Sequence, residues 1–205
     1  LTGVGFRLGF VVIQTAGDIS NFFSNIWPIS FFSFEDLRLF FSLVLIAISC
    51  IIMGAGIPTT ATYIILVAVA APALAQLGIE PLVAHFFVFY YGVLADITPP
   101  VALAAYAASG IAKSNPFKTG NTAFRLGIAK ALVPFVFVYS PSLLLITGEF
   151  QTDQLLITLA GTLIGIALIG IAFSGYWFRN LKSYEQIIIG IGSLFFVAPG
   201  TSSMI

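Results

Sequence analysis

Charged side chains are scarce in this sequence. Lysine and arginine account for 8 of its 205 residues, and aspartate and glutamate for another 8. A soluble domain usually has about 25% charged residues, whereas this chain has 8% and is 59% hydrophobic. The formal net charge is zero, so there is no basic footprint for nucleic acid. The composition excludes an ordinary soluble domain and predicts an all-α integral membrane protein.

Histidine and cysteine occur only once each, as His85 and Cys50. A lone cysteine forms no internal disulfide, and we interpret Cys50 as a small buried hydrophobe. Metal-binding spacings, nucleotide-binding loops and the nucleophile motifs of hydrolases are missing from the sequence. We therefore expect no zinc or haem site in this chain, and the sequence predicts that it is not an enzyme.

Two apolar segments are interrupted by residues that a continuous membrane helix avoids. The first interruption, Gly54 to Thr60, reads GAGIPTT, and the second, Ala95 to Val101, reads ADITPPV. Proline lacks the backbone N–H and pushes the preceding residue out of helical geometry, so both interruptions should free backbone carbonyls. In a membrane such groups are tolerated only inside protein or beside a polar cavity. Both breaks are therefore candidate sites.

Apolar arms lie on both sides of each break. The arms 37–53 and 61–77 flank the first break and form either two spans or one re-entrant hairpin, which the uncharged tip favours. The segments 81–94 and 101–112 are half-helices around the second break. Residues 1–17 form a modest apolar segment, and 18–36 are expected to be an interfacial loop rich in phenylalanine.

The second half of the sequence predicts ordinary helices joined by polar turns. Helices are expected over 122–147, 154–178 and 186–198, with kinks in the first at Pro134 and Pro141. Basic residues gather in two of the connecting regions, and an acidic turn at 149–153 lies between them. The positive-inside rule places the loops 113–121 and 179–185 in the cytoplasm. The basic residues of these two regions and of the helix start that follows the first are Lys113, Lys118, Arg125, Lys130, Arg179 and Lys182.

Three blocks of the sequence resemble one known family. They are GAGIPTTA from Gly54, AHFFVFYYGVL from Ala84 and DITPPVALA from Asp96. Together they look like the large membrane subunit of tripartite ATP-independent periplasmic (TRAP) transporters. The variant resembles the branch in which small and large membrane subunits are fused and work with a TAXI-type binding protein. The resemblance is strong over 37–148 and weak on the flanks.

The resemblance implies half of an inverted-repeat elevator transporter in the cytoplasmic membrane of a bacterium or archaeon. The chain would be the C-terminal part of a longer permease: a truncated N-terminal segment and aromatic loop at 1–36, a transport-domain half at 37–112 and scaffold helices at 113–205. The transport half would contain a re-entrant hairpin at 37–77 and a broken helix at 81–112. The implied partners are membrane lipid, the N-terminal part of the permease, the small membrane subunit and a periplasmic TAXI-type binding protein, which delivers an organic anion.

The resemblance also implies Na⁺ as the coupling ion and supplies its ligands. They would be backbone carbonyls near Gly54 and Gly56, together with Ala95, Thr98 and Val101. The hydroxyl of Thr98 is a further hard oxygen donor at the break itself.

Other polar residues near the breaks remain open to two interpretations. Thr59 and Thr60 either touch the substrate or cap the second hairpin arm. Asp96 either touches ion or substrate or holds the broken helix to a neighbour, and Thr98 is a candidate for substrate contact as well. His85 serves either proton coupling or, as we favour, helix packing.

Two other classes of function compete with a Na⁺-coupled carboxylate importer. In a channel, the broken helix would form the selectivity constriction. In a membrane-embedded enzyme or assembly subunit, Asp96 and His85 would be the polar pair. Saturable uptake that needs Na⁺ and a binding protein would separate the importer from both.

Overall fold

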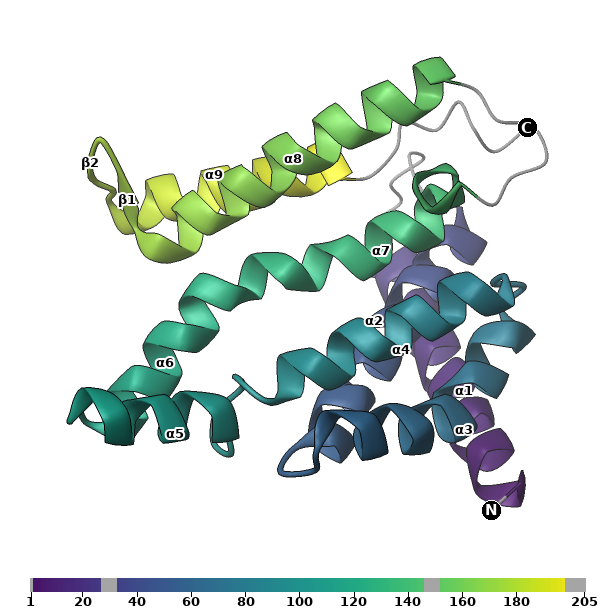
Figure 1. The fold of residues 1–205 in the computed structure, drawn as a ribbon. Coiled ribbons are helices and arrows are strands. Elements are labelled where there is room, and N and C mark those ends of the chain that lie inside the picture. The colour runs from purple at the N-terminus through teal and green to yellow at the C-terminus, as the bar shows by residue number, and fades with distance from the viewer. Residues whose placement is uncertain (1, 27–32, 146–151, 198–205) are drawn as a thin grey trace. The chain divides into compact units, whose positions relative to one another are not determined.

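A computed structural model describes residues 2–26, 33–145 and 152–197 of the chain. Helices dominate these residues, and the remaining regular structure is one pair of two-residue strands (Figure 1). The prediction of an all-α integral membrane protein is confirmed. The elements are α1 (Thr2–Ile26), α2 (Phe34–Gly54), α3 (Thr59–Gln76), α4 (Pro81–Ala95), α5 (Leu103–Ala112), α6 (Pro116–Gly127), the 3-10 helix η1 (Ile128–Ala131), α7 (Leu132–Tyr139), the 3-10 helix η2 (Pro141–Leu144), α8 (Thr152–Ser174), β1 (Tyr176–Trp177), β2 (Arg179–Asn180) and α9 (Ser183–Val197).

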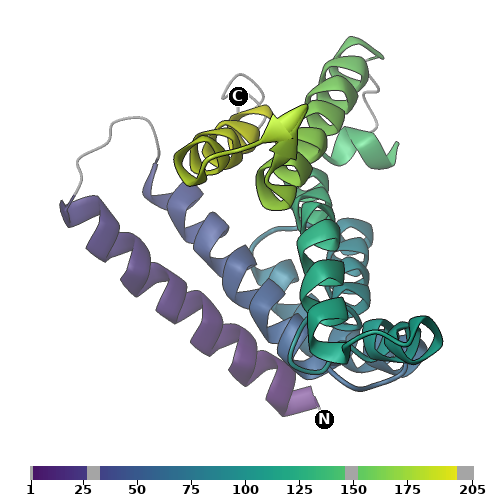
Figure 2. The same ribbon diagram turned by 90° about the vertical axis from the view of Figure 1, so that its left-hand side faces the viewer.

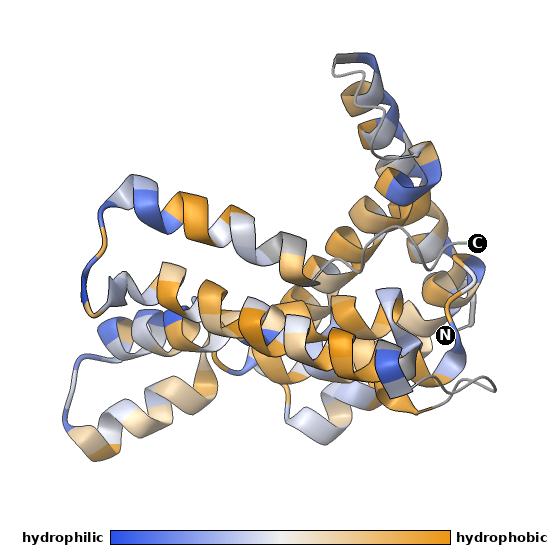
Figure 3. Ribbon diagram, turned by 90° about the horizontal axis from the view of Figure 1, so that it is seen from above, coloured by the Kyte–Doolittle hydropathy of each residue, from blue (hydrophilic) through white to orange (hydrophobic). Residues whose placement is uncertain are grey.

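Four helical stretches in the described residues are long and apolar enough to cross a membrane. They are Phe34–Gly54, Thr59–Gln76, Pro116–Tyr139 and Leu155–Ser174. Many of their large apolar side chains are exposed, as lipid-facing side chains must be. Figure 3 shows apolar residues along the helices and hydrophilic residues gathered near helix ends and turns.

The chain divides into two compact units, Leu1–Ala95 and Asp96–Ile205. This division follows compactness and falls inside the second break. The functional division that the sequence predicts, at 36 and 112, stays a prediction.

In the first unit, α1 packs on α2 and α3, and α4 packs on the same two helices. Figure 2 shows α1 beside α2. The contact of α1 with α3 is close because α1 presents two glycines one turn apart. A Cβ on Gly5 would lie 2.8 Å from the carbonyl oxygen of Ala68, and one on Gly9 would lie 2.8 Å from the Cβ of Ala73. Such small residues let two membrane helices approach at backbone distance.

The buried face of the first unit is apolar and comes from α2, α3 and α4. Cys50 belongs to it and is a free, buried thiol, as predicted from the sequence. The largest fully buried side chains of this face are Leu43, Leu66, Leu74, Val83, Phe87, Val88 and Leu94.

In the second unit, α5 and α6 pack together and α8 packs beside α9 (Figure 1). A core of Ala129, Leu132, Val136 and Ile169 joins η1 and α7 to α8. A Cβ on Gly161 of α8 would lie 2.8 Å from the carbonyl oxygen of Phe196 in α9, so this pair is also closely packed.

The interfacial loop predicted at 18–36 is wrong over most of its described length. Residues up to Ile26 continue α1, and α2 already begins at Phe34. Polar side chains do not stop α1, because the hydroxyls of Ser20 and Ser24 donate to carbonyls four residues earlier, at 2.7 and 2.9 Å. The remainder of the predicted loop, 27–32, lies outside the described residues.

Helix starts also fall earlier than the hydrophobic pattern predicted. The hydroxyl of Ser33 accepts the N–H of Asp36, and the Asp36 carboxylate accepts the N–H of Ser33, which is a capping box. Asn115 caps α6 in the same position, with Pro116 at the first helical residue, so 116–121 are helical instead of part of a loop. Both signals were present in the sequence and were outweighed by hydropathy.

The predicted helix 122–147 is divided by its prolines. Pro134 has no N–H for the carbonyl of Lys130 and its ring clashes there, and the turn before it tightens into η1. The helix then ends at Tyr139, and η2 begins at Pro141. Similarly, α8 stops at Ser174 and not at 178, because Gly175 adopts φ +72°. Most of the predicted acidic turn, 149–151, lies outside the described residues.

Candidate functional site

The first break is the turn between α2 and α3. α2 ends at Gly54, Ala55 is its C-cap, and Gly56 adopts φ +83°, which glycine accepts without strain. The N–H of Ile57 donates weakly to the carbonyl of Gly54 at 3.4 Å. Gly56 and Pro58 are exposed. The turn that the sequence predicted is therefore present, and its backbone is exposed at Gly56 and Pro58 instead of being enclosed in a helix.

Thr62 fastens this tip from inside. Its side chain is buried, with 1% exposed, and its hydroxyl donates to the carbonyl of Ile57 at 3.0 Å. The N–H of Thr62 also donates to the carbonyl of Pro58 at 2.9 Å. Sequence reasoning missed this residue because it looked only at the threonines beside the proline.

Thr59 and Thr60 occupy the first turn of α3 and are exposed. The N-cap of α3 is Pro58, which makes no side-chain cap hydrogen bond. Neither threonine is therefore the N-cap residue of this helix. Their contact with a substrate remains a hypothesis, and their exposure at the tip is compatible with it.

Four small residues make a close junction beneath the tip. A Cβ on Gly54 would lie 2.9 Å from Cγ2 of Thr62 and 3.1 Å from the Cβ of Ala95. A Cβ on Gly92 would lie 3.2 Å from the same Cγ2 of Thr62. Gly54, Thr62, Gly92 and Ala95 thus bring the end of α2, the start of α3 and the end of α4 together. A glycine inside an apolar helix signals such close packing, and Gly92 could have been singled out on that ground.

We expect Thr62→Val to loosen the tip while keeping its shape. The substitution removes the hydroxyl and leaves the Ile57 carbonyl without its donor, at a cost of about 1 kcal/mol. Hydrogen exchange of residues 55–60 would measure the loss of protection. Thr62→Ser retains the hydroxyl, and Thr60→Val makes the same chemical change at an exposed position. Equal protection in Thr62→Val and wild type would contradict the role given to this bond.

The second break runs from the end of α4 at Ala95 to the start of α5 at Leu103. The peptide bond between Pro99 and Pro100 is cis, and Ala102 adopts a left-handed conformation with φ +36°. The predicted non-helical segment at Thr98 and Pro99 is confirmed. The residue in this left-handed conformation is the buried Ala102, directly before α5 begins at Leu103. Because alanine is not glycine, this conformation strains the backbone at Ala102.

Several carbonyls in this break are already hydrogen-bonded. The carbonyl of Asp96 accepts the N–H of Ala104 at 3.2 Å, and that of Thr98 accepts the N–H of Ala102 at 3.1 Å. The hydroxyl of Tyr106 donates to the carbonyl of Pro100 at 2.7 Å. The break is therefore a shaped turn held by its own hydrogen bonds.

Helix α6 supports the break from outside. A Cβ on Gly127 would overlap Cδ1 of Ile97, and one on Gly120 would lie 2.9 Å from the ring of Tyr106. Sequence reasoning missed Tyr106, Gly120 and Gly127. No periodicity relates them to the proline pair, and only the packing of α5 on α6 brings them to it.

His85 lies at the far end of α4 from the break. Its Nδ1 is 2.7 Å from the hydroxyl of Tyr63 in α3, and the ring of Tyr63 also meets Phe89 edge-on. About 15 Å of helix separates His85 from Ala95 at 1.5 Å per residue. The helix-packing role favoured for His85 agrees with this hydrogen bond, and a joint role with Asp96 gains no support from it.

The predicted ligands and contact residues divide between the two units. Gly54, Gly56 and Ala95, like Thr59 and Thr60, belong to the first unit, where Gly54 touches Ala95. Asp96, Thr98 and Val101 belong to the second and lie between the end of α4 at Ala95 and the start of α5 at Leu103. The structure thus describes the two halves of the predicted sodium site separately.

The predicted donors are backbone carbonyls in both halves and, in the second half, the hydroxyl of Thr98; oxygen donors of this kind suit a hard cation such as Na⁺. In the described part of the chain, no three His, Cys, Asp or Glu side chains gather as a group that could hold a metal ion. An oxygen-only donor set of this kind is compatible with an alkali ion.

A model of a known protein family matches most of the chain. The family described as the tripartite ATP-independent periplasmic transporter, DctM component, matches residues 1–152. That range contains both breaks and α4 between them, and it ends at the first residue of α8. Comparison with curated proteins and with solved structures gave no match.

Proposed function

The chain belongs to the family of tripartite ATP-independent periplasmic (TRAP) transporters, as a DctM component, and we propose that it forms the C-terminal part of a Na⁺-coupled permease for organic anions. The family is one of transporters, and its large components work with a periplasmic binding protein and a small membrane subunit. The finer proposal names the substrates as carboxylates, the binding protein as TAXI-type and the membrane subunits as fused.

One observation supports this function above the others. Two interruptions of apolar helices flank a single helix, α4, and small residues join its end to the first interruption. Interrupted membrane helices place helix ends and carbonyls where ions and anionic substrates bind. Helix N-termini attract carboxylates, and the carbonyls of Gly54, Gly56, Ala95 and Val101 with Thr98 would supply the oxygen ligands of Na⁺.

The elevator mechanism follows as part of the proposal. The hairpin of α2 and α3 would move together with α4, because their junction leaves no space for sliding. The hydrogen bond from Tyr63 to His85 adds a second fixed point between α3 and α4. Scaffold helices after residue 112 would remain static, with the loops 113–121 and 179–185 in the cytoplasm of a bacterial or archaeal cell.

Transport by the complete system tests this proposal. The full permease with its small subunit would be reconstituted in proteoliposomes and supplied with the binding protein and a panel of labelled mono- and dicarboxylates. We expect saturable uptake that requires an inward Na⁺ gradient and the binding protein. Ion currents that need neither would indicate a channel and contradict the proposal.

A further inference from the structure

The turn between α8 and α9 has a defined fold of its own. Gly175 ends α8 in a left-handed conformation, and its carbonyl accepts the N–H of Leu181 at 2.8 Å. Between them β1 and β2 pair antiparallel, with Tyr176 opposite Asn180. Phe178 lies at the tip with φ +53°. This turn lies beyond the range that the family match covers, so the transporter function does not account for it.

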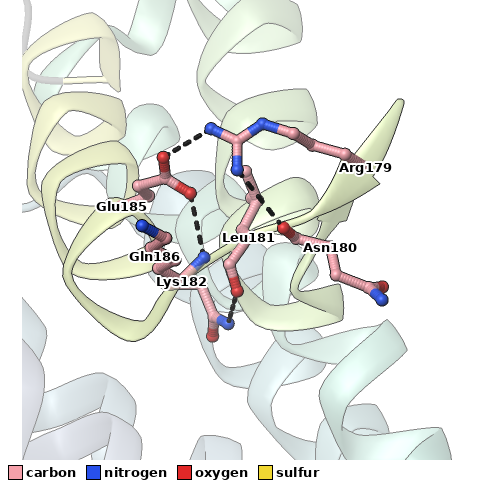
Figure 4. Close-up of polar contacts among 6 residues, drawn as sticks. All are labelled: Arg179, Asn180, Leu181, Lys182, Glu185 and Gln186. Carbon is pink, nitrogen blue, oxygen red and sulfur yellow. Dashed lines mark hydrogen bonds and ion pairs between the residues drawn. The ribbon is translucent and has the colours of Figure 1, made fainter.

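Two side chains at the start of α9 hold the turn in shape (Figure 4). The Glu185 carboxylate accepts the N–H of Lys182 at 2.9 Å and a guanidinium N–H of Arg179 at 2.5 Å. The Gln186 amide donates to the carbonyl of Leu181 at 3.1 Å. The Arg179 guanidinium holds the pKa of Glu185 below its usual value, so this carboxyl stays ionised at neutral pH.

Aromatic side chains project from this turn without being buried. Phe178 is 88% exposed and Trp177 is 47% exposed, and Tyr176 and Tyr184 are exposed as well. The turn directly follows Leu155–Ser174, a stretch long and apolar enough to cross a membrane. Aromatic rings at the end of such a stretch lie at the level of the lipid headgroups, where an apolar face and a polar edge are both accommodated.

Cations surround the same end of α8. Arg125 donates from Nη2 and Nε to the carbonyl of Phe173 at 2.8 and 3.1 Å, and so caps the helix. Arg179 follows on β2, and the Lys182 ammonium lies 5.8 Å from the centre of the Tyr184 ring. Among the residues of this turn, the Glu185 carboxylate opposes these three cations and is ion-paired with Arg179. The surplus of positive charge complements an anionic surface.

We propose that the turn from Gly175 to Tyr184 binds anionic phospholipid headgroups and anchors α8 and α9 at the membrane interface. Trp177 and Phe178 enter the interfacial layer, while Arg179 and Lys182 face the phosphates. A lipid is favoured over a protein partner because rings and cations lie together at the end of a span, as interfacial anchors do. The hydrogen bonds of Glu185 and Gln186 hold the turn in one conformation before it binds lipid, so the loss of conformational entropy on binding is small.

Fluorescence of Trp177 tests its depth in the bilayer. The chain has two tryptophans; in the full permease, Trp27 and every further tryptophan except Trp177 would be replaced by phenylalanine. The protein would be reconstituted in phosphatidylcholine vesicles whose acyl chains carry bromine at a shallow or a deep position. We expect stronger quenching by the shallow label. Stronger quenching by the deep label, or none by either label, would overturn the proposal, and the second result would indicate a protein partner over the turn.

Selectivity for anionic lipid is tested with spin-labelled phosphatidylglycerol and phosphatidylcholine. We expect Lys182→Gln to lower the preference for phosphatidylglycerol about fivefold, because one cation near the surface contributes about that factor. Lys182 binds Glu185 through its backbone, so the turn keeps its fold in this variant. Lys113→Gln is the matched control at another exposed turn and should lower the preference less than Lys182→Gln does. An unchanged preference in Lys182→Gln, or an equal loss in Lys113→Gln, would contradict the assignment.

Discussion

Replacing Gly54 by valine is expected to abolish uptake by the assembled transporter while the protein still inserts into the membrane. A Cβ at this position would already lie 2.9 Å from Cγ2 of Thr62 and 3.1 Å from the Cβ of Ala95, and valine adds two further methyl groups. Thr62 has little freedom to move, because its hydroxyl is bonded to the carbonyl of Ile57. Overpacking of this kind costs about 1–3 kcal/mol.

The consequence falls on the tip rather than on the fold as a whole. Any separation of α2 from α4 displaces Gly54 and Ala95, whose carbonyls are proposed ligands of Na⁺. A cation site tolerates such shifts poorly, because oxygen ligands are effective only within a narrow range of distances. Uptake in proteoliposomes measures the loss, and thermal unfolding in detergent measures the stability.

Gly17→Val provides the matched control for Gly54→Val. Gly17 lies in α1 of the same unit, and a Cβ there would meet nothing within 4 Å. Any general effect of valine in a membrane helix would appear in both variants, and only Gly54→Val should stop uptake. Normal uptake by Gly54→Val would show that the junction of Gly54 with Thr62 and Ala95 does not control the site.

Substituting Thr98 by alanine is expected to raise the Na⁺ concentration needed for half-maximal uptake about tenfold, equivalent to about 1.4 kcal/mol. The change removes one hydroxyl oxygen at the second break and leaves its backbone turn, closed by the 3.1 Å bond from the Ala102 N–H to the Thr98 carbonyl. Losing one hard oxygen ligand weakens the binding of the cation without abolishing it. Maximal uptake at saturating Na⁺ should therefore be largely retained.

Thr98→Ser distinguishes a ligand from a packing residue. Serine keeps the hydroxyl and loses the methyl group, so its Na⁺ dependence should stay close to that of the wild type. A substrate contact would instead raise the substrate concentration needed and leave the Na⁺ dependence unchanged. If both variants retain wild-type Na⁺ dependence, the Thr98 hydroxyl is not a sodium ligand.

The sequence predicted the helical arms and breaks well because their signals are local. The apolar arms expected around the first break are observed as α2 and α3, and the half-helices expected around the second as α4 and α5. Glycine and proline restrict the backbone wherever they occur, so Gly56 and Pro99 define turns without help from distant residues. Errors arose where hydropathy competed with capping, as at Ser33 and Asn115.

The contacts of the site were harder to predict because they join distant segments. Nothing in the pattern around Thr62 distinguishes it from Thr59 and Thr60, and its role depends on Gly92, thirty residues away. The role of Tyr106 could not be predicted from the sequence either, because its hydroxyl reaches the Pro100 carbonyl only once the chain has turned into α5.

By itself the sequence determined that this is a helical membrane protein, where its helices break and which family it resembles. Those properties depend on composition and on the backbone limits of glycine and proline, which act at short range. Only the tertiary structure decided which threonine fastens the tip, which glycines admit a neighbouring helix and how Tyr63 engages His85. Helix packing brings these residues together although they are far apart in the sequence, and the sequence alone does not show which distant residues come into contact.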